Sequence, residues 1–130
     1  MYDVYLAAPL WTIEQKERVL SLAESFRQEG YSVYVPMEHE IDNAWDMPQH
    51  EWSKKVFDAD IKAIHESSAV VAIYNGLYSD SGTAFEVGYA YALKKDVYIM
   101  PYLETNEISL MIKNAVKNPE IFDEIGVIEK

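Results

Sequence analysis

The chain has 130 residues, with 11 Lys or Arg against 22 Asp or Glu, which gives a formal net charge of −11. A surface of that charge repels phosphate backbones, so we expect no nucleic-acid polymer as a partner. Hydrophobic residues make up 49% of the chain and charged residues 25%, as in an ordinary folded protein. The length suits one hydrophobic core, and we therefore expect residues 1–130 to form a single domain.

Residue types and motifs that the sequence lacks exclude several kinds of site. There is no cysteine, which rules out disulfides and thiolate metal sites. His39, His50 and His65 have no metal-ligand spacing, so we interpret them as solvated or loop residues and expect no metal. Glycine-rich nucleotide motifs are missing, and no cofactor is expected. No apolar stretch approaches the roughly 20 residues that cross a bilayer, which favours a cytoplasmic protein without a membrane partner.

Apolar runs alternate with helical patterns from the start of the chain. Residues 4–8 form a short apolar run that predicts a buried strand. Thr12 and Gln15 then form a capping box, followed by apolar residues at helical spacing that end before Gly30. A second strand is predicted over residues 31–35. The first third of the chain therefore predicts a strand, a helix and a strand.

The same alternation continues in the rest of the chain. The acidic segment 37–47 predicts an irregular loop that ends at Pro48, a residue suited to a helix start. Residues 69–74 are apolar on both faces, which is typical of a strand in a parallel sheet covered by helices. The remaining predicted elements are a helix over 83–93, a strand over 97–100, a helix over 107–116 and a short strand over 125–128.

This order of elements predicts an α/β fold, a doubly wound open parallel sheet of four to five strands with helices on both faces, like flavodoxin and Rossmann folds. In such sheets ligands bind just beyond the carboxyl ends of the strands. Those ends fall at residues 8–11, 36–38 and 75–82, where we expect the functional site.

Two carboxylates, Asp80 and Glu86, follow the central strand and open the next helix. A carboxylate in the first turn of a helix is stabilised by backbone N–H groups, so we expect Glu86 to be ionised at pH 7. An ionised carboxylate can attack an anomeric carbon and stabilise the oxocarbenium-like transition state. The alternative is structural, because Thr83 and Glu86 also fit a capping box, and Asp80 or Ser81 could cap the same helix.

Asp60 lies at the edge of the apolar stripe of the helix after Pro48, with Val56 and Ile64 at i−4 and i+4. Burial of a carboxyl group raises its pKa. Such a group suits a general acid that protonates a leaving base. The alternative interpretation is a residue that caps or pairs with a neighbouring loop.

Two aromatic residues belong to the end of the first predicted strand. Tyr5 lies on the strand and Trp11 in the loop that follows. An aromatic side chain at that position could stack on a base or bond to a carboxylate. Core packing explains Tyr5 almost as well.

Taken together, these segments resemble the nucleoside 2-deoxyribosyltransferase family. The likeness covers residues 4–10, 60–73 and 80–93, the last with the specific pattern Asp-x-Gly-Thr-Ala-Phe-Glu-Val-Gly-Tyr-Ala. It implies a transferase that exchanges the base of 2′-deoxynucleosides through a covalent deoxyribosyl ester on Glu86, without a cofactor. The implied partners are small deoxynucleosides and free nucleobases. The resemblance also implies a homo-oligomer in which a neighbouring subunit completes each site.

The resemblance assigns further roles. It implies that Tyr5 orients Glu86 and that Asp80 bonds the sugar hydroxyls. Asp60 falls where hydrolytic relatives that act on nucleoside monophosphates carry a proton-donating Asp. The expected catalytic residues are Glu86, Asp60 and Tyr5, and the expected substrate-binding residues are Asp80, Gly82, Trp11 and Ser109.

Two differences from the transferases and two from the monophosphate hydrolases bear on the choice of substrate. Ser68 stands where many transferases carry an Asp that contacts the base, and Ser109 where they often carry an Asn. A Ser at the latter position is closer to the monophosphate hydrolases, where it helps to hold phosphate. Those hydrolases, however, usually have a Ser at position 80 and an Arg- and Gly-bearing loop at positions 9–11. Because an anionic Asp80 would repel a 5′-phosphate, we favour free nucleosides.

Two other functions stay open from the sequence. One is an N-glycoside hydrolase of deoxynucleosides or their 5′-monophosphates, which would use the same Glu86 ester and release it to water. The other is a non-catalytic sensor of nucleosides or nucleotides on the same scaffold.

Overall fold

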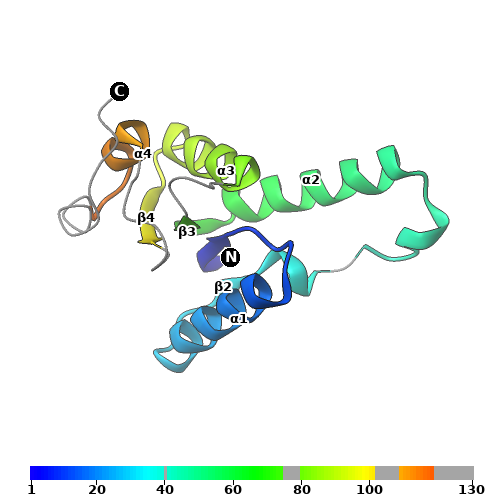
Figure 1. Ribbon diagram of the computed structural model, residues 1–130, viewed down its shortest axis with the longest axis horizontal. Helices are drawn as coiled ribbons and strands as arrows, with labels where there is room; N and C mark the ends of the chain where they lie inside the picture. The colour runs from blue at the N-terminus through cyan, green and yellow to red at the C-terminus, as the bar shows by residue number, and fades with distance from the viewer. Residues whose placement is uncertain (40, 75–79, 102–108, 119–130) are drawn as a thin grey trace.

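The computed structural model describes residues 1–39, 41–74, 80–101 and 109–118, and its centre is a sheet of four parallel strands (Figure 1). The strands lie in the order β2-β1-β3-β4. Their bounds are Tyr2–Ala7 for β1, Val33–Tyr34 for β2, Ser67–Tyr74 for β3 and Asp96–Pro101 for β4. Helices connect these parallel strands, which confirms the predicted open α/β sheet.

Helices cover both faces of the sheet, as predicted. In Figure 1, α1 lies below the sheet, and α2, α3 and α4 lie above it. Their bounds are Ile13–Gln28 for α1, Gln49–His65 for α2, Ser81–Ala92 for α3 and Leu110–Ala115 for α4. The chain moves outward from β1 to β2 and then crosses back to β3, so the winding reverses between β1 and β3. Ligands of doubly wound sheets bind at the carboxyl edge of such a reversal.

Both faces of the central strands are buried because successive strand residues point to opposite sides of a sheet. On the lower face, Leu6 and Ile73 pack with Val19 of α1. On the upper face, Tyr5 and Val70 belong to a cluster that also contains buried residues of the covering helices, namely Ala63, Ile64, Val87 and Ala90. The apolar runs in the sequence therefore reflect burial on two sides.

The predicted helix signals after β1 are confirmed. The Thr12 side chain accepts a hydrogen bond from the Gln15 backbone, and the Gln15 side chain accepts one from the Thr12 backbone. After α1, Gly30 adopts a φ of 95°, which residues with a Cβ rarely adopt. This turn directs the chain back toward the sheet.

Strand β2 is shorter than predicted, with two residues in place of five. Ser32, which was expected inside the strand, donates its backbone N–H to the Asp3 carboxylate at 2.8 Å. The Asp3 side chain thus accepts the hydrogen bond of a backbone N–H that, inside a strand, would be donated to a backbone carbonyl of the neighbouring strand. The segment predicted as an irregular loop contains two short 3-10 turns, η1 (Pro36–Glu38) and η2 (Ala44–Asp46). The strand predicted over 125–128 lies outside the described residues.

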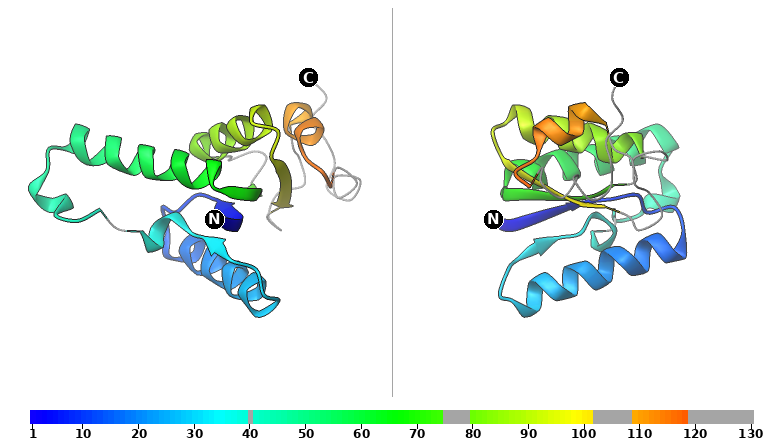
Figure 2. Two further views of the ribbon diagram at one scale, coloured as in Figure 1. Left: turned by 180° about the vertical axis from the view of Figure 1, so that it is seen from behind. Right: turned by 60° about the vertical axis from the view of Figure 1, so that its left-hand side comes forward.

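Helix α2 reaches past the edge of the sheet. Its C-terminal part packs into the core through Ala63 and Ile64, whereas its N-terminal part projects outward with η2 at its tip (Figure 2). Pro48, which was predicted to start this helix, is its N-cap, and the first helical residue is Gln49. Within the described ranges, no helix is long and apolar enough to span a membrane.

Candidate active site

Asp80 begins α3 at the carboxyl edge of the central strand β3. Its Oδ2 accepts hydrogen bonds from the backbone N–H and the hydroxyl of Thr83, each at 2.9 Å. Asp80 is therefore the N-cap of α3, as one of the structural alternatives predicted. A Cβ on the adjacent Gly82 would lie 3.1 Å from Asp80 Oδ2, so the glycine leaves room for this carboxylate.

Trp11 connects the loop after β1 to the same carboxylate. Its indole Nε1 donates a hydrogen bond to Asp80 Oδ1 at 3.3 Å. Its backbone N–H is held by the side chain of Gln15 at 2.8 Å, as an extension of the α1 capping box. Of the two contacts predicted for an aromatic residue here, the structure contains the bond to a carboxylate. The Trp11 side chain is otherwise open, with 82% of its surface exposed.

Glu86 is bound by a residue of the sheet. The hydroxyl of Tyr5, a fully buried residue of β1, donates a hydrogen bond to Glu86 Oε2. The contact predicted between these two residues is present, and it joins α3 to β1 at the reversal of the winding. The ring of Tyr5 packs in the core and its hydroxyl contacts the Glu86 carboxylate, so both of the predicted interactions are present.

The expected ionisation of Glu86 by the helix terminus is wrong. Helix α3 begins at Ser81, so Glu86 lies in its second turn, beyond the reach of the terminal N–H groups. Burial instead raises the pKa of Glu86 to about 8, although the Tyr5 hydrogen bond lowers it. The nearby carboxylates of Asp60 and Asp80 raise it further. The capping box proposed for Thr83 and Glu86 is also wrong, since Asp80 is the cap.

Asp60 reaches the same site from α2. Burial raises the pKa of its carboxyl to about 6, as predicted from its place on the apolar stripe. In the described part of the chain no hydrogen bond or ion pair to its side chain is found, so the structure offers no support for the capping or pairing alternative. Two carboxyl groups with raised pKa values thus share one site.

A cavity of about 260 Å³ lies between α2 and α3 and contains both carboxyl groups. We call it the carboxyl cavity. Its other walls are mostly apolar: Ser53, Val56, Phe57, Ile61, Ile64, Gly82 and Phe85. Apolar walls strengthen electrostatic interactions between the groups that they enclose.

A second cavity, of about 440 Å³, lies on the other side of Asp60. We call it the aromatic cavity, since Trp45, Trp52 and His39 contribute to its walls. Its other lining residues are Leu10, Pro36, Met37, Ile41, Ala44, Val56 and Asp60. Asp60 thus lines both cavities.

His39 is a site residue that the sequence did not single out. It was interpreted as a loop or solvated residue, but its ring stacks on Tyr34 at 4.1 Å and lines the aromatic cavity. Its one sequence signal is its place just after the second predicted strand end. Among the described residues, no group of three or more His, Asp or Glu side chains is placed to hold a metal ion.

Two residues at which the sequence differs from the transferases, Ser68 and Ser109, lie outside this site. Ser68 is at the amino end of β3, opposite to the edge where Asp80 begins α3. Ser109 is the N-cap of α4 and accepts a hydrogen bond from the Met111 backbone at 3.1 Å. Neither cavity includes Ser109. Its role in substrate binding stays a prediction.

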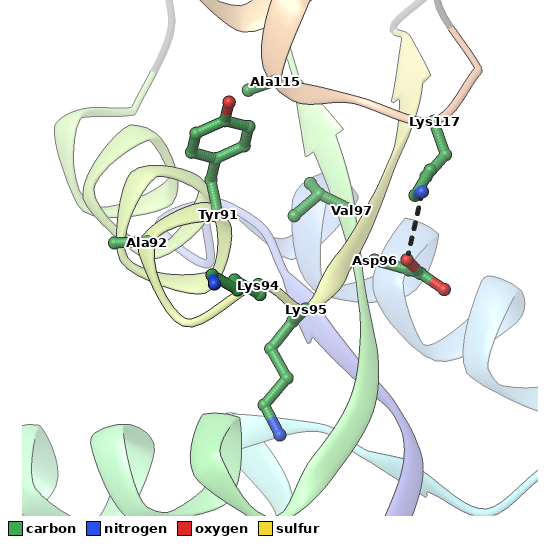
Figure 3. A pocket seen from close by; sticks show the side chains of 8 residues that line it. All are labelled: Tyr91, Ala92, Lys94, Lys95, Asp96, Val97, Ala115 and Lys117. Atoms are coloured by element: carbon green, nitrogen blue, oxygen red, sulfur yellow. Dashed lines mark ion pairs between the residues drawn. The ribbon is translucent and has the colours of Figure 1, made fainter.

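A further hollow of about 420 Å³ lies beside the amino end of β4 and the end of α3 (Figure 3). Three lysines line it, and two of them already have partners. Lys117 pairs with Asp96 at 3.5 Å, and Lys95 donates to the backbone oxygen of His65 at 2.9 Å. This hollow contains neither Glu86 nor Asp60, and we do not assign it to the active site.

The fold and the site together define a parallel α/β protein with two neighbouring carboxyl groups at the switch point of its sheet. Such paired carboxyl groups serve the cleavage of glycosidic bonds. The sequence profile of the nucleoside 2-deoxyribosyltransferase family matches residues 4–118, and the chain belongs to this family of enzymes that act on deoxynucleosides.

Individual relatives are named either as hydrolases or as transferases. A protein of Thermofilum pendens named for 2′-deoxynucleoside 5′-phosphate N-hydrolase activity is 30% identical over 85% of this chain and 76% of its own. A nucleoside deoxyribosyltransferase of Limosilactobacillus fermentum is 26% identical over 87% of this chain and 75% of its own. The structure of a 2-deoxyribosyltransferase from Bacillus psychrosaccharolyticus matches with a TM-score of 0.79 and 28% identity, over 98% of this chain and 86% of that one.

Proposed function

We propose that this chain is a nucleoside 2-deoxyribosyltransferase that exchanges the base of 2′-deoxynucleosides through a covalent ester on Glu86. The observation that carries the proposal is the hydrogen bond from the Tyr5 hydroxyl to Glu86, beside a second carboxyl group in the same cavity. The hydroxyl leaves the other oxygen of Glu86 available to attack C1′. The family supports a deoxyribosyl substrate.

The reaction needs one proton shared between two carboxyl groups. The Glu86 carboxylate attacks C1′, the C1′–N bond breaks, and Asp60 donates its proton to the departing base. An incoming base then attacks C1′, the ester bond breaks, and Asp60 takes back a proton from that base. Two inversions at C1′ give net retention, and no other reactant is consumed.

Burial favours the resting proton on Glu86, whose pKa is about 8, over Asp60, whose pKa is about 6. The attack requires the opposite arrangement, with the proton on Asp60. Positive charge that develops at C1′ favours the carboxylate form of Glu86, and the Tyr5 hydroxyl stabilises that form. We therefore propose that the substrate itself moves the proton to the productive position.

The surroundings of the two carboxyl groups suit the base of a nucleoside on one side and its sugar on the other. The aromatic cavity next to Asp60 suits a flat base, which its tryptophans could cover. Asp80 suits the sugar, because a sugar hydroxyl could replace the indole of Trp11 at its Oδ1. We propose Gly82 as a substrate-binding residue on the same side.

We further propose that a second subunit completes the site in a homo-oligomer. Large apolar side chains stand exposed around the two cavities, with 85% of Trp45 exposed and half of Phe57 and Phe85. Contiguous exposed apolar surface is typical of a contact with another protein. Mass measurement in solution by light scattering tests this point.

A hydrolase is the second candidate, and the 30% identity to the protein of Thermofilum pendens favours it. It would use the same Glu86 ester and transfer the sugar to water. An equimolar mixture of 2′-deoxyinosine and adenine distinguishes the two when its products are separated by chromatography. Glu86→Gln is the inactive variant, and Glu24→Gln on the exposed side of α1 is the matched control.

Each result of this experiment has one meaning. Formation of 2′-deoxyadenosine by the wild type and the control, but not by Glu86→Gln, supports the transferase. Hypoxanthine with free deoxyribose, without 2′-deoxyadenosine in spite of the adenine present, contradicts it and supports the hydrolase. A sensor is supported by a separate experiment, in which 2′-deoxyinosine binds and neither nucleosides nor their 5′-monophosphates are turned over.

A further inference from the structure

The register of the sheet places a second tyrosine beside Tyr5. Tyr34 of β2 is the partner of Tyr5 of β1 in the parallel ladder, so both side chains point to the upper face. Their ring centroids are 5.5 Å apart and their planes differ by 9°. Tyr5 is fully buried and Tyr34 is 5% exposed, so the two rings are confined against each other.

Tyr34 is itself held by two other rings. The imidazole of His39 stacks on it with centroids 4.1 Å apart and an interplanar angle of 8°. The ring of Tyr2 meets it edge-on at 5.1 Å and 72°. His39 also lines the aromatic cavity, so this group of rings extends from the proposed base site to the partner of Glu86.

We propose that Tyr34 is a positioning residue that keeps the hydroxyl of Tyr5 on Glu86, and that His39 fixes Tyr34 from the wall of the aromatic cavity. The catalytic meaning of this role rests on the proposed function of Glu86. A hydrogen bond from a tyrosine depends on the direction of its ring, because the hydroxyl lies at the end of a rigid group. Tyr34 sets that direction by contact with the face of the Tyr5 ring.

The ring of Tyr34, rather than its hydroxyl, carries this role. No hydrogen bond to that hydroxyl is found in the described parts of the chain. Burial, with contributions from Asp60 and Tyr2, raises the pKa of Tyr34 to about 12, so the ring is neutral where the enzyme works. We therefore expect Tyr34→Phe to keep the Tyr5 ring in position. In Tyr34→Leu this positioning should be lost, because the Tyr5 ring is then free to tilt.

The pKa of Glu86 reports whether Tyr5 is in place. The groups that face Glu86 are Tyr5 from β1, Asp60 from α2 and Asp80 at the start of α3. Of these, the Tyr5 hydrogen bond is the one that lowers its pKa. Displacement of Tyr5 therefore makes Glu86 titrate at higher pH, whereas a general loosening that admits water would have the opposite effect.

The test is an NMR titration of carboxyl-labelled glutamate in the wild type and in four variants, Tyr34→Leu, Tyr34→Phe, Tyr5→Phe and Tyr5→Phe/Tyr34→Leu. We expect Tyr34→Leu to shift the titration of Glu86 upward, as Tyr5→Phe does. The double variant should titrate like Tyr5→Phe alone, and Tyr34→Phe like the wild type. Tyr98→Leu is the matched control, since Tyr98 pairs with Val71 on the lower face of the sheet.

The kinetic counterpart is a fall in kcat of about tenfold in Tyr34→Leu, with little change in KM and recovery in Tyr34→Phe. The inference is overturned if Glu86 titrates in Tyr34→Leu as in the wild type while Tyr5→Phe shifts it. If Tyr34→Leu does not fold, His39→Ala should give a smaller shift in the same direction, and no shift overturns the inference. The titration of Glu86 needs no turnover, so its result is independent of the proposed function. The proposed function fails if Glu86→Gln is as active as the wild type.

Discussion

The hydroxyl of Tyr5 donates a hydrogen bond to Glu86 from a strand 81 positions away in the sequence. This bond joins β1 to α3 at the point where the winding of the sheet reverses. It opposes the effect of burial, which by itself favours a neutral Glu86. The ionised form that the proposed reaction needs therefore depends on a residue of the first strand.

Removal of this hydroxyl gives the first prediction. In Tyr5→Phe the ring still fills the core, but a buried carboxylate loses a hydrogen bond worth about 1.5–3 kcal/mol. We expect kcat/KM to fall by roughly 10- to 100-fold, with the unfolding temperature almost unchanged. Steady-state kinetics and thermal unfolding measure the two effects. Unchanged kinetics would contradict the role of Tyr5.

The second prediction concerns pH and Asp60. The carboxyl pair should be active with one proton, between the pKa of about 6 for Asp60 and about 8 for Glu86, so kcat/KM should follow a bell-shaped curve. In Asp60→Asn the alkaline fall should disappear, because the only remaining requirement is an ionised Glu86. We also expect kcat to fall by about 100-fold or more.

Asp58→Asn is the matched control for Asp60→Asn. Asp58 lies on the same helix but points outward, where it pairs with Lys54 at 2.6 Å. Its substitution should leave the bell-shaped curve in place. A bell that persists in Asp60→Asn would show that another group donates the proton.

The third prediction is a pH-dependent gain in stability in Glu86→Gln. The pKa of Glu86 is about 8 in the folded protein against 4.5 for an ordinary glutamate, so the folded state holds the proton more tightly. The stability that this residue contributes is therefore present below pH 4.5 and is lost as pH rises to about 8. Glutamine avoids this loss, and we expect its unfolding temperature to exceed that of the wild type by roughly 5 °C at about pH 9.

The same comparison at about pH 5 should give a small difference, because most Glu86 is then protonated in the folded protein. Differential scanning calorimetry at the two pH values measures both. A difference that is equal at the two pH values would mean that Glu86 is not buried as a neutral carboxyl.

The fourth prediction compares two glycines of α3. A Cβ on Gly88 meets nothing within 4 Å, so Gly88→Ala should stabilise the protein by about 0.5–1 kcal/mol and leave kinetics unchanged. In Gly82→Ala the new Cβ lies 3.1 Å from Asp80 Oδ2 and must displace it. We expect no gain in stability and a KM for the nucleoside that rises about threefold or more, since Asp80 is the proposed sugar ligand.

Chemical denaturation and steady-state kinetics of the two alanine variants give this comparison directly. Equal stability and equal KM for the two would contradict the close fit between Gly82 and Asp80.

Much of the fold could be predicted because it is encoded locally. The apolar runs of β1 and β3, the capping box of Thr12 and Gln15, and the turn at Gly30 all depend on neighbours in the sequence. The place of the site followed from the topology, since Asp80 opens the helix that follows the central strand. The pKa of Asp60 followed from its position on the stripe of α2.

The features that were missed depend on packing between distant segments. The pKa of Glu86 is set by its burial and by Tyr5, Asp60 and Asp80, three residues from three parts of the chain. An error of two residues in the start of α3 also placed Glu86 in the wrong helical turn. The stack of His39 on Tyr34 arises between a loop and a strand, and no periodicity predicts it.

The covalent ester is the central claim, and mass spectrometry tests it most directly. Wild-type protein would be mixed with 2′-deoxyinosine without an acceptor base, quenched in acid within seconds and digested. We predict a peptide containing Glu86 that is heavier by one deoxyribosyl group, with an equal amount of hypoxanthine released and no such peptide from Glu86→Gln. Rapid release of base with no adduct at Glu86, or with an adduct on another residue, would contradict it.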